Sequence, residues 1–476
     1  MLIVGLLLPV VLGLTLCWLI IPDAAIPECF ALAYSLGFGF LTLAMFFLNI
    51  LGFKFSLVNT TIFVSAIIGV LLVFTGKRNW LRLRSAMKVN PFTRIKQFMG
   101  SLSAFEKILV GLLTFFLLSH LVIAVYWPVF WSDSLTGYDL RAKLFFETQS
   151  FPGALAEILD RIVNVGYGFA IFQDSPMTSL VHTWLYLCGW ASPKVFYPLL
   201  FISLVALFYH LLRDYVPRYH ALLFTLLLVT TPYIYMYSTN SYPHFAFALY
   251  FSVGTFYLYG WIRRQKRSFL LLAGIFLGLS AWVRQASGIF FMGYLVIVLY
   301  VGVSRRRFFA PLIFSVLYFS IARWWGIYLQ RFLHFDSMGA LGSISQLPVF
   351  LPMITRFFNF ALWKEVLAFF WKYVLLSCRP IFYLLILSTP LYIERVWKHR
   401  FLFLMVLSNL ILFLLGIYIT ILIKEDLHQA SARRLFLTFL PIIWYFIALI
   451  TAQLQFSNGK SSLAENSSSS GRQKGQ

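Results

Sequence analysis

The chain has 476 residues, of which 61% are hydrophobic and only 11% are charged, whereas soluble domains average roughly 45–50% and 25%. This composition excludes a soluble enzyme. The formal net charge is +22, but the lysines and arginines stand in short clusters between long apolar runs, whereas a nucleic-acid-binding protein gathers them on one hydrated face. We therefore expect a multi-pass membrane protein with its basic loops in the cytoplasm, and no nucleic-acid partner.

The apolar runs predict an all-α polytopic membrane protein with about 13 transmembrane helices, because a helix needs about 20 apolar residues to cross a bilayer. The basic stretch 77–107 and the clusters that begin at Arg263, Arg305 and Arg395 are expected in the cytoplasm, and parity then places the N-terminus outside. The predicted spans are 1–21, 27–52, 56–75, 108–127, 194–212, 220–237, 245–262, two short helices between Arg267 and Arg305, 308–325, 373–393, 401–423 and 435–453.

The loop 128–176, after the fourth span, is expected on the exoplasmic side and concentrates negative charge. Apolar residues at helical spacing predict an amphipathic juxtamembrane helix over 152–164. The apolar segment 177–190, at about 14 residues, is too short to span comfortably, so we expect a re-entrant or interfacial helix there. Six of the 16 acidic residues lie in the loop: Asp133, Asp139, Glu147, Glu157, Asp160 and Asp174.

The chain divides into four parts. We expect an N-terminal three-helix segment with its basic loop (1–107), a catalytic membrane core that includes the loop 128–176 (108–325), a second exoplasmic segment with the last membrane helices (326–456), and a disordered cytoplasmic tail (457–476). The four cysteines have no CxxC spacing, which argues against a disulfide framework and a zinc site.

Polar residues in or beside a membrane span suggest a functional site if they face a cavity. A carboxylate can serve as general base for an acceptor hydroxyl, and a guanidinium group can hold phosphate through two hydrogen bonds. This division of labour suits the transfer of a group from a lipid phosphate. The topology gathers the candidates on the exoplasmic side: Asp133, Asp139, Arg141, Lys143, Asp174, Tyr242, His244, Arg284, Arg433 and Arg434.

Most of these residues also have a purely structural interpretation. Arg284 is the hardest to explain in that way, because an arginine between two short apolar helices needs a partner or an aqueous cavity. The structural alternatives are solvation for Asp133 and Asp139, headgroup anchoring for Arg141, Lys143, Arg433 and Arg434, capping of the helix after Pro176 for Asp174, and an interfacial position for His244.

Four segments, taken in order, resemble the integral-membrane glycosyltransferases of the GT-C superfamily, in particular the bacterial branch related to protein O-mannosyltransferases and aminoarabinose transferases. The closing Arg433-Arg434 before Leu440-Pro441 is similar to the family's final Arg-before-Pro helix. The resemblance covers about residues 108–453. The four segments are 131–143 (WSDSLTGYDLRAK), 174–180 (DSPMTSL), 231–246 (TPY, then SYPHFA) and 274–288 (GIFLGLSAWVRQASG).

The resemblance implies a polyprenyl-phosphate sugar donor, an acceptor that approaches from the exoplasmic face, and inversion at the anomeric centre. Asp133 is the best match to the family's catalytic Asp, and Asp139 is the next candidate. His244 stands where the family commonly has Asp, which argues against a metal or second-acid role at that position. By the same resemblance, the donor phosphate would be held by Arg284, Arg434, Arg433, Lys143 and Arg141, and the acceptor side would be lined by Asp174, His244 and Tyr242.

We therefore predict an inverting, polyprenyl-phosphate-sugar-dependent glycosyltransferase in a bacterial inner membrane, acting on a glycan, lipid or protein acceptor. No cofactor is predicted, and dependence on a divalent metal stays open. The alternatives are an O-antigen ligase or polymerase, a lipid-linked sugar flippase or transporter, and a noncatalytic assembly subunit. A transporter is expected to show repeated halves and broken helices near the midplane. Here the charges gather at one face, which favours an enzyme.

Overall fold

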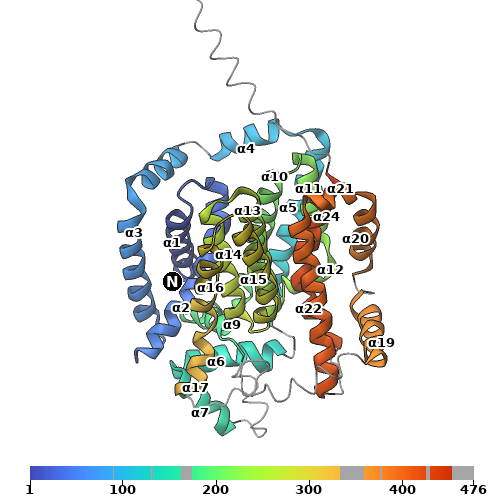
Figure 1. Cartoon of the computed structure of the whole chain (residues 1–476). Helices are drawn as coiled ribbons and strands as arrows, with labels where there is room; N and C mark the ends of the chain where they lie inside the picture. The colour runs from blue at the N-terminus through green and yellow to red at the C-terminus, as the bar shows by residue number, and fades with distance from the viewer. Residues whose placement is uncertain are drawn as a thin grey trace, which may run out of the picture.

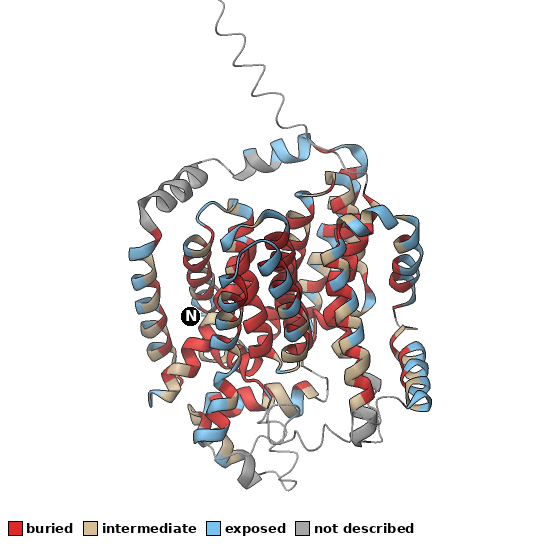
Figure 2. Ribbon diagram, in the orientation of Figure 1, coloured by how far each residue is buried: buried red, intermediate tan, exposed pale blue. Residues whose placement is uncertain are grey.

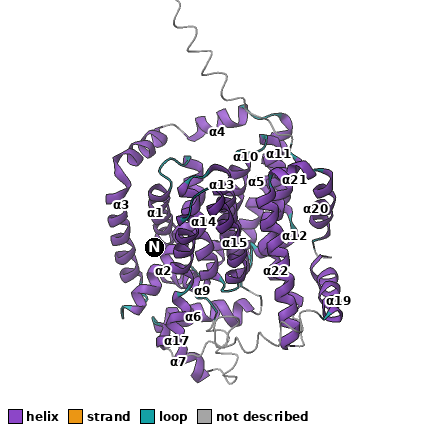
Figure 3. Cartoon of the chain, in the orientation of Figure 1, coloured by secondary structure: helices purple, strands orange, loops and turns teal. Residues whose placement is uncertain are grey.

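The computed structural model describes residues 1–88, 91–129, 131, 133–161, 174–332, 359–375, 378–424 and 429–452. These residues form helices and contain no strand (Figure 3). Nine helices in the described part are long and apolar enough to cross a membrane, or up to eleven spans if each of two bent helix pairs counts as one. The chain is therefore an all-helical, multi-pass membrane protein, as its composition predicts.

The first three predicted spans are confirmed as α1, α2 and the first part of α3, and later ones are confirmed as long helices. The predicted tail 457–476 lies outside the described residues. The long helices are α1 (Leu2–Ile20), α2 (Ile26–Ile50), α3 (Leu57–Lys88), α5 (Ala104–Tyr126), α10 (Phe196–Arg213), α13 (Pro243–Arg264), α15 (Ser287–Ser304), α22 (Arg400–Lys424) and the span Ala432–Thr451, which ends in α24 (Leu440–Thr451).

Several predicted spans are shorter or bent. Segment 220–237 is broken at Thr231 into α11 (Arg218–Thr230) and α12 (Pro232–Tyr237), because Pro232 has no N–H to continue the helix. Length and composition thus support nine to eleven spans in the described part, whereas the prediction of about 13 also counted the shorter helices. The other predicted spans that are shorter or bent are α14 (Arg267–Val283), α16 (Phe309–Ala322) bent by 46° against α17 (Trp324–Phe332), and α19 (Phe360–Phe369) with η4 (Phe370–Val374) bent by 116° against α20 (Arg379–Leu391).

Helix α13 lies at the centre of the bundle, and its whole apolar window is buried (Figure 2). It packs against α10, α14 and α24. Helix α3 lies at the edge, with only 17% of its apolar window buried. A helix that is apolar on all sides must be covered by protein or by lipid. The exposed faces of α3 and of the other apolar helices at the edge of the bundle are therefore expected to contact lipid.

Helices α1 and α2 approach each other at backbone distance. A Cβ added to Gly13 would lie 1.8 Å from the carbonyl oxygen of Ala33, and one added to Gly37 would lie 1.8 Å from that of Pro9. Small residues at such crossings allow close helix contact inside a membrane, where dispersion forces rather than water exclusion hold helices together. Close packing at these two glycines therefore joins α1 to α2.

The short helices that follow α5 lie at one end of the bundle, which we call the loop end. It contains α6 (Asp139–Thr148), α7 (Phe151–Arg161) and α17, whereas α4 (Pro91–Gly100) and α21 (Ile393–Lys398) lie at the opposite end (Figure 1). Helix α7 forms the described part of the predicted juxtamembrane helix 152–164. The described part of the loop 128–176 therefore forms short helices laid across one end of the bundle.

The short apolar segment 177–190 forms α9 (Met177–Leu187), whose side chains from Met177 to Leu185 are all buried. It packs against α6 and α2. The indole N–H of Trp184 donates to the carbonyl of Gly5 at 2.9 Å, and that of Trp190 donates to the carbonyl of Leu2 at 3.2 Å. Helix α9 is thus embedded in the protein, where it ties the start of α1 to the loop end.

Candidate functional site

Asp133 and Arg434, which are 301 residues apart in the sequence, form an ion pair at the loop end. Asp133 stands directly before η1 (Ser134–Tyr138), a π-helical turn that leads into α6, and Arg434 lies on α23 (Gln429–Phe436). Single π-helical turns are frequent at functional sites. The Asp133 side chain keeps 45% exposure and that of Arg434 18%. The carboxylate is therefore paired but still accessible.

The Arg434 guanidinium lies over the ring of Tyr242, 5.0 Å from its centroid. Tyr242 in turn packs against the rings of Trp131, Tyr237 and His244, with centroids about 6 Å apart. An aromatic face attracts a cation and restrains its position. The aromatic cluster thus holds Arg434 in place and links it to His244.

Arg284 donates a hydrogen bond from Nη1 to Nε2 of His244. A guanidinium can only donate, so Nε2 must be the acceptor and His244 must be neutral with its proton on Nδ1. Arg284 follows α14 in an extended conformation, with φ −151° and ψ 122°, which turns it out of the helix. The partner that the sequence requires for Arg284 is therefore His244, at the start of α13.

Tyr138 and Asp174 extend the site towards α9. The Tyr138 hydroxyl donates to Oδ2 of Asp174 at 2.9 Å, and the charges of Asp174 and Arg284 both act on this phenol. Burial, with the Asp174 carboxylate, raises the pKa of Tyr138. The N-cap of α9 is Pro176, without a side-chain hydrogen bond. The interpretation of Asp174 as a helix cap is therefore wrong.

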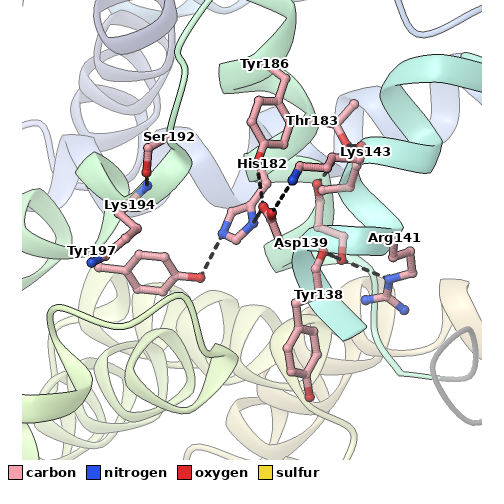
Figure 4. Close-up of polar contacts among 12 residues, drawn as sticks. Tyr138, Asp139, Arg141, Lys143, His182, Thr183, Tyr186, Ser192, Lys194 and Tyr197 are labelled. Carbon is pink, nitrogen blue, oxygen red and sulfur yellow. Dashed lines mark hydrogen bonds and ion pairs between the residues drawn. The ribbon is translucent and has the colours of Figure 1, made fainter. Parts of the chain in front are cut away.

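Arg141 is fully buried and its guanidinium is used inside the protein. Its Nε donates to Oγ of Ser179 at 2.9 Å, the bond drawn as a dashed line from Arg141 in Figure 4. Nη1 donates to the carbonyl of Asp174 at 2.7 Å, and Nη2 donates to the carbonyl of Ser175 at 2.9 Å. The interpretation of Arg141 as a headgroup anchor is wrong, because an anchor keeps its charged end in water. Arg141 instead fixes α6 to the segment that carries Asp174.

We expect Arg141→Met to destabilise the folded protein more than it weakens binding of the polyprenyl-phosphate sugar that the resemblance implies. The change leaves two buried carbonyl groups without a hydrogen bond, and each unsatisfied carbonyl costs about 1–3 kcal/mol of stability. The thermal unfolding temperature in detergent measures the effect, with Arg141→Lys measured for comparison. Lys keeps the charge but cannot reach all three acceptors, so we expect Arg141→Lys to lose an intermediate amount of stability. A normal unfolding temperature with lost donor binding would instead assign Arg141 to the phosphate.

Asp139, 2% exposed, is surrounded by partners and is not a solvated loop residue. Its carboxylate accepts from the hydroxyl of Tyr186 at 2.5 Å and lies 3.3 Å from both Nζ of Lys143 and Nδ1 of His182. His182 also contacts the hydroxyl of Tyr197 through Nε2, at 2.9 Å (Figure 4). Burial raises the pKa of Asp139, but His182, Tyr186 and Lys143 outweigh it and lower that pKa to about 2.

A carboxylate with so low a pKa and so many partners is a poor general base, because the base works best when its pKa lies near the working pH. Asp139 therefore suits a structural role between α6 and α9. Lys143 is 54% exposed and its ammonium contacts Asp139, so it interacts with this network rather than with the Asp133–Arg434 pair.

Asp139→Asn is expected to lower the stability by about 2 kcal/mol at neutral pH. The folded-state pKa of Asp139 is about 2, below the unfolded value of about 3.9. The stabilisation is therefore complete above about pH 4 and is lost as the pH falls towards 2. Unfolding temperatures measured from pH 7 to pH 2 should show a constant gap between wild type and variant down to about pH 4, then a narrowing gap. A gap that stays constant to pH 2 would contradict this assignment.

Arg433 and Arg434 are neighbours in sequence but have different partners. Nε of Arg433 donates to the carbonyl of Tyr373 at 2.7 Å, and its guanidinium lies 5.7 Å from the centre of that ring. Arg433 thus fixes α23 to η4, while Arg434 faces Asp133. The structure brings Asp133, Arg434, Tyr242, His244 and Arg284 together, and it separates Arg433 from them.

Lys194 is a residue that the sequence interpretation missed. It is 1% exposed, and its ammonium donates to the carbonyl of Trp127 at 2.7 Å. This bond fixes the end of α5, from which the chain runs to Asp133. A signal existed, because a lysine at the outer start of a span is unusual on the side that is normally poor in Lys and Arg.

Among the described residues, no group of three or more His, Cys, Asp and Glu side chains could hold a metal ion. The chain matches no family model, no curated protein and no solved structure. Any functional assignment therefore rests on the geometry of this site and on the segments that resemble the GT-C transferases.

Proposed function

We propose that the protein is an inverting glycosyltransferase that moves a sugar from polyprenyl phosphate to an acceptor hydroxyl at the loop end. The observation that carries the proposal is the ion pair between the half-exposed Asp133 and Arg434, with Arg284 and His244 beside it. One carboxylate and two guanidinium groups from three distant parts of the chain meet at one place. This is the division of labour that transfer from a lipid phosphate requires.

Asp133 acts as general base. It takes the proton from the acceptor hydroxyl while the hydroxyl oxygen forms a bond to the anomeric carbon. The bond between that carbon and the phosphate oxygen breaks, and the oxygen leaves with the electron pair. Arg434 holds the carboxylate before the donor arrives, and its remaining N–H groups can then bind the departing phosphate.

Arg284 is the second phosphate ligand. Its contact with neutral His244 directs one N–H and leaves the others for the donor. The phosphate gains charge as the glycosidic bond breaks, so two fixed cations stabilise the transition state more than the ground state. Tyr242 supports this by restraining Arg434.

The orientation follows from the basic residues at the opposite end of the bundle. Arg264 ends α13, Arg305 follows α15, and Lys398 ends α21. Basic loops are kept on the cytoplasmic side, so the loop end faces the exoplasm in this proposal. The resemblance to bacterial transferases favours a bacterial inner membrane.

Purified protein in proteoliposomes, supplied with a panel of radiolabelled polyprenyl-phosphate sugars and a membrane extract as acceptor, tests the function. We expect release of polyprenyl phosphate together with transfer of the label. Label that crosses the bilayer without a new bond would instead show a flippase, and a product lengthened by whole glycan chains would show a ligase or polymerase. If no donor is bound, moved or consumed, the proposal is wrong and a noncatalytic subunit remains.

A further inference from the structure

Four buried polar atoms beside the two arginines have no hydrogen-bond partner among the residues that the structure describes. They are Nδ2 of Asn240, Oγ of Ser241, the hydroxyl of Tyr242 and Nδ1 of His244. Their residues are 4%, 2%, 1% and 3% exposed. A buried polar atom without a partner is destabilising, and a bound molecule that completes its hydrogen bonds is one explanation for its presence in a folded protein. Four within five residues indicate a binding function.

The four side chains are presented by one tight connection between α12 and α13. The backbone N–H of Tyr242 donates to the carbonyl of Asn240 at 2.8 Å, and Pro243 begins the next helix. Within this connection His244 contacts Arg284, and Tyr242 lies under Arg434. Both guanidinium charges act on His244. The unpartnered atoms therefore lie next to Arg284 and Arg434, the proposed phosphate-binding residues. The sugar of a bound polyprenyl-phosphate sugar would lie there.

Asn240 and His244 present hydrogen-bond donors in this connection. Because Arg284 occupies Nε2 of His244, the free Nδ1 carries the proton and can only donate. Nδ2 of Asn240 offers two further N–H groups, and Arg284 and Arg434 add positive charge, whereas the hydroxyls of Ser241 and Tyr242 can donate or accept. A ligand group beside Asn240 and His244 must therefore supply oxygen lone pairs. An ammonium group there would meet donors and like charges, which is a repulsive element against amino sugars.

We propose that the connection 240–244 is the sugar-recognition part of the site, and that it selects sugars presenting hydroxyl or carboxylate oxygens over sugars bearing an ammonium group. This inference rests on the proposed function, because it is the phosphate bound by Arg284 and Arg434 that brings the sugar to these residues. It adds a sugar class to that function and makes Asn240 and His244 its specificity determinants.

The test compares two donors that differ at one position, a polyprenyl-phosphate pentose and its analogue with one hydroxyl replaced by an ammonium group. Each competes against radiolabelled polyprenyl phosphate for the purified, reconstituted full-length protein. We expect wild type to bind the polyprenyl-phosphate sugar with the hydroxyl at least tenfold more tightly than its ammonium analogue. This is the order of magnitude expected when one hydrogen bond is lost and one like-charge contact is added. Binding is read directly, so the result does not depend on knowing the acceptor.

Two variants replace an N–H donor by a carboxylate, Asn240→Asp and His244→Asp, and each is expected to shift the preference about tenfold towards the ammonium donor. The ratio of the two affinities cancels any general loss caused by the effect of His244→Asp on Arg284. Asn59→Asp makes the same change at the start of α3, where the side chain bonds to the carbonyl of Lys54, and should leave the ratio unchanged.

The two proposals fail in different ways. If polyprenyl phosphate binds but wild type does not discriminate, or if the ratio is the same in both variants as in wild type, the sugar-recognition inference is wrong and the proposed function stands. If wild type binds no polyprenyl phosphate at all, the proposed function is wrong and the inference falls with it.

Discussion

Asp133→Asn is expected to reduce glycosyl transfer by about 10²–10⁴-fold, the usual contribution of a positioned general base. The amide has nearly the same shape as the carboxylate but cannot accept the proton of the acceptor hydroxyl. It can still accept a hydrogen bond from Arg434 through its oxygen, so the loop end should keep its arrangement. The initial rate of polyprenyl phosphate release in proteoliposomes measures the loss, and gel filtration and thermal unfolding confirm that the variant is folded.

Two matched changes serve as controls for this result. Asp23→Asn lies in the loop between α1 and α2, away from the site, and should leave the rate unchanged. Asp139→Asn should affect stability more than rate, because Asp139 is buried in the network with Tyr186 and His182. Near-wild-type transfer by Asp133→Asn would reject Asp133 as the base.

Arg434→Gln is expected to weaken the binding of polyprenyl phosphate by about 10- to 100-fold, because hydrogen bonds to a charged group contribute roughly 1.5–3 kcal/mol. It should also lower the maximal rate, since the departing phosphate loses a cation in the transition state. Arg284→Gln should have a similar effect on donor affinity, because it removes the second guanidinium. Equilibrium binding of radiolabelled polyprenyl phosphate measures the first effect, and initial rates at saturating donor measure the second.

Arg433→Gln is the matched control, since it makes the same change one residue earlier in the chain. Arg433 is bonded to the carbonyl of Tyr373 rather than to Asp133, so this variant should keep most of its affinity for the donor and lose stability instead. If the two variants lost affinity equally, or if Arg433→Gln lost more, the assignment of Arg434 as the phosphate ligand would be rejected.

Several features were predictable from the sequence because they depend on local composition. A long apolar run can satisfy its backbone hydrogen bonds inside lipid only as a helix, and clusters of Lys and Arg mark the ends of such helices. These two rules place α1, α2, α5, α10 and α13 and gather the candidate residues at one end. The resemblance also names Asp133, Arg284 and Arg434, which the structure brings together at the loop end.

Other features depend on contacts between distant parts of the chain, which no local pattern encodes. Arg433 and Arg434 are equivalent by sequence, and only the packing of α23 directs one to Tyr373 and the other to Asp133. Asp139 and Arg141 look like solvated or anchoring residues of a polar loop, yet both are buried because α9 packs against α6. The break of 220–237 at Pro232 likewise shortens a predicted span.

The sequence by itself determined that this protein crosses a membrane many times and which ten residues are candidates for a functional site. Only the tertiary structure decided which of them face one another. The physical reason is that hydropathy and charge act over a few residues along the chain, whereas the partner of a buried charge is chosen by three-dimensional packing, here across 301 residues between Asp133 and Arg434.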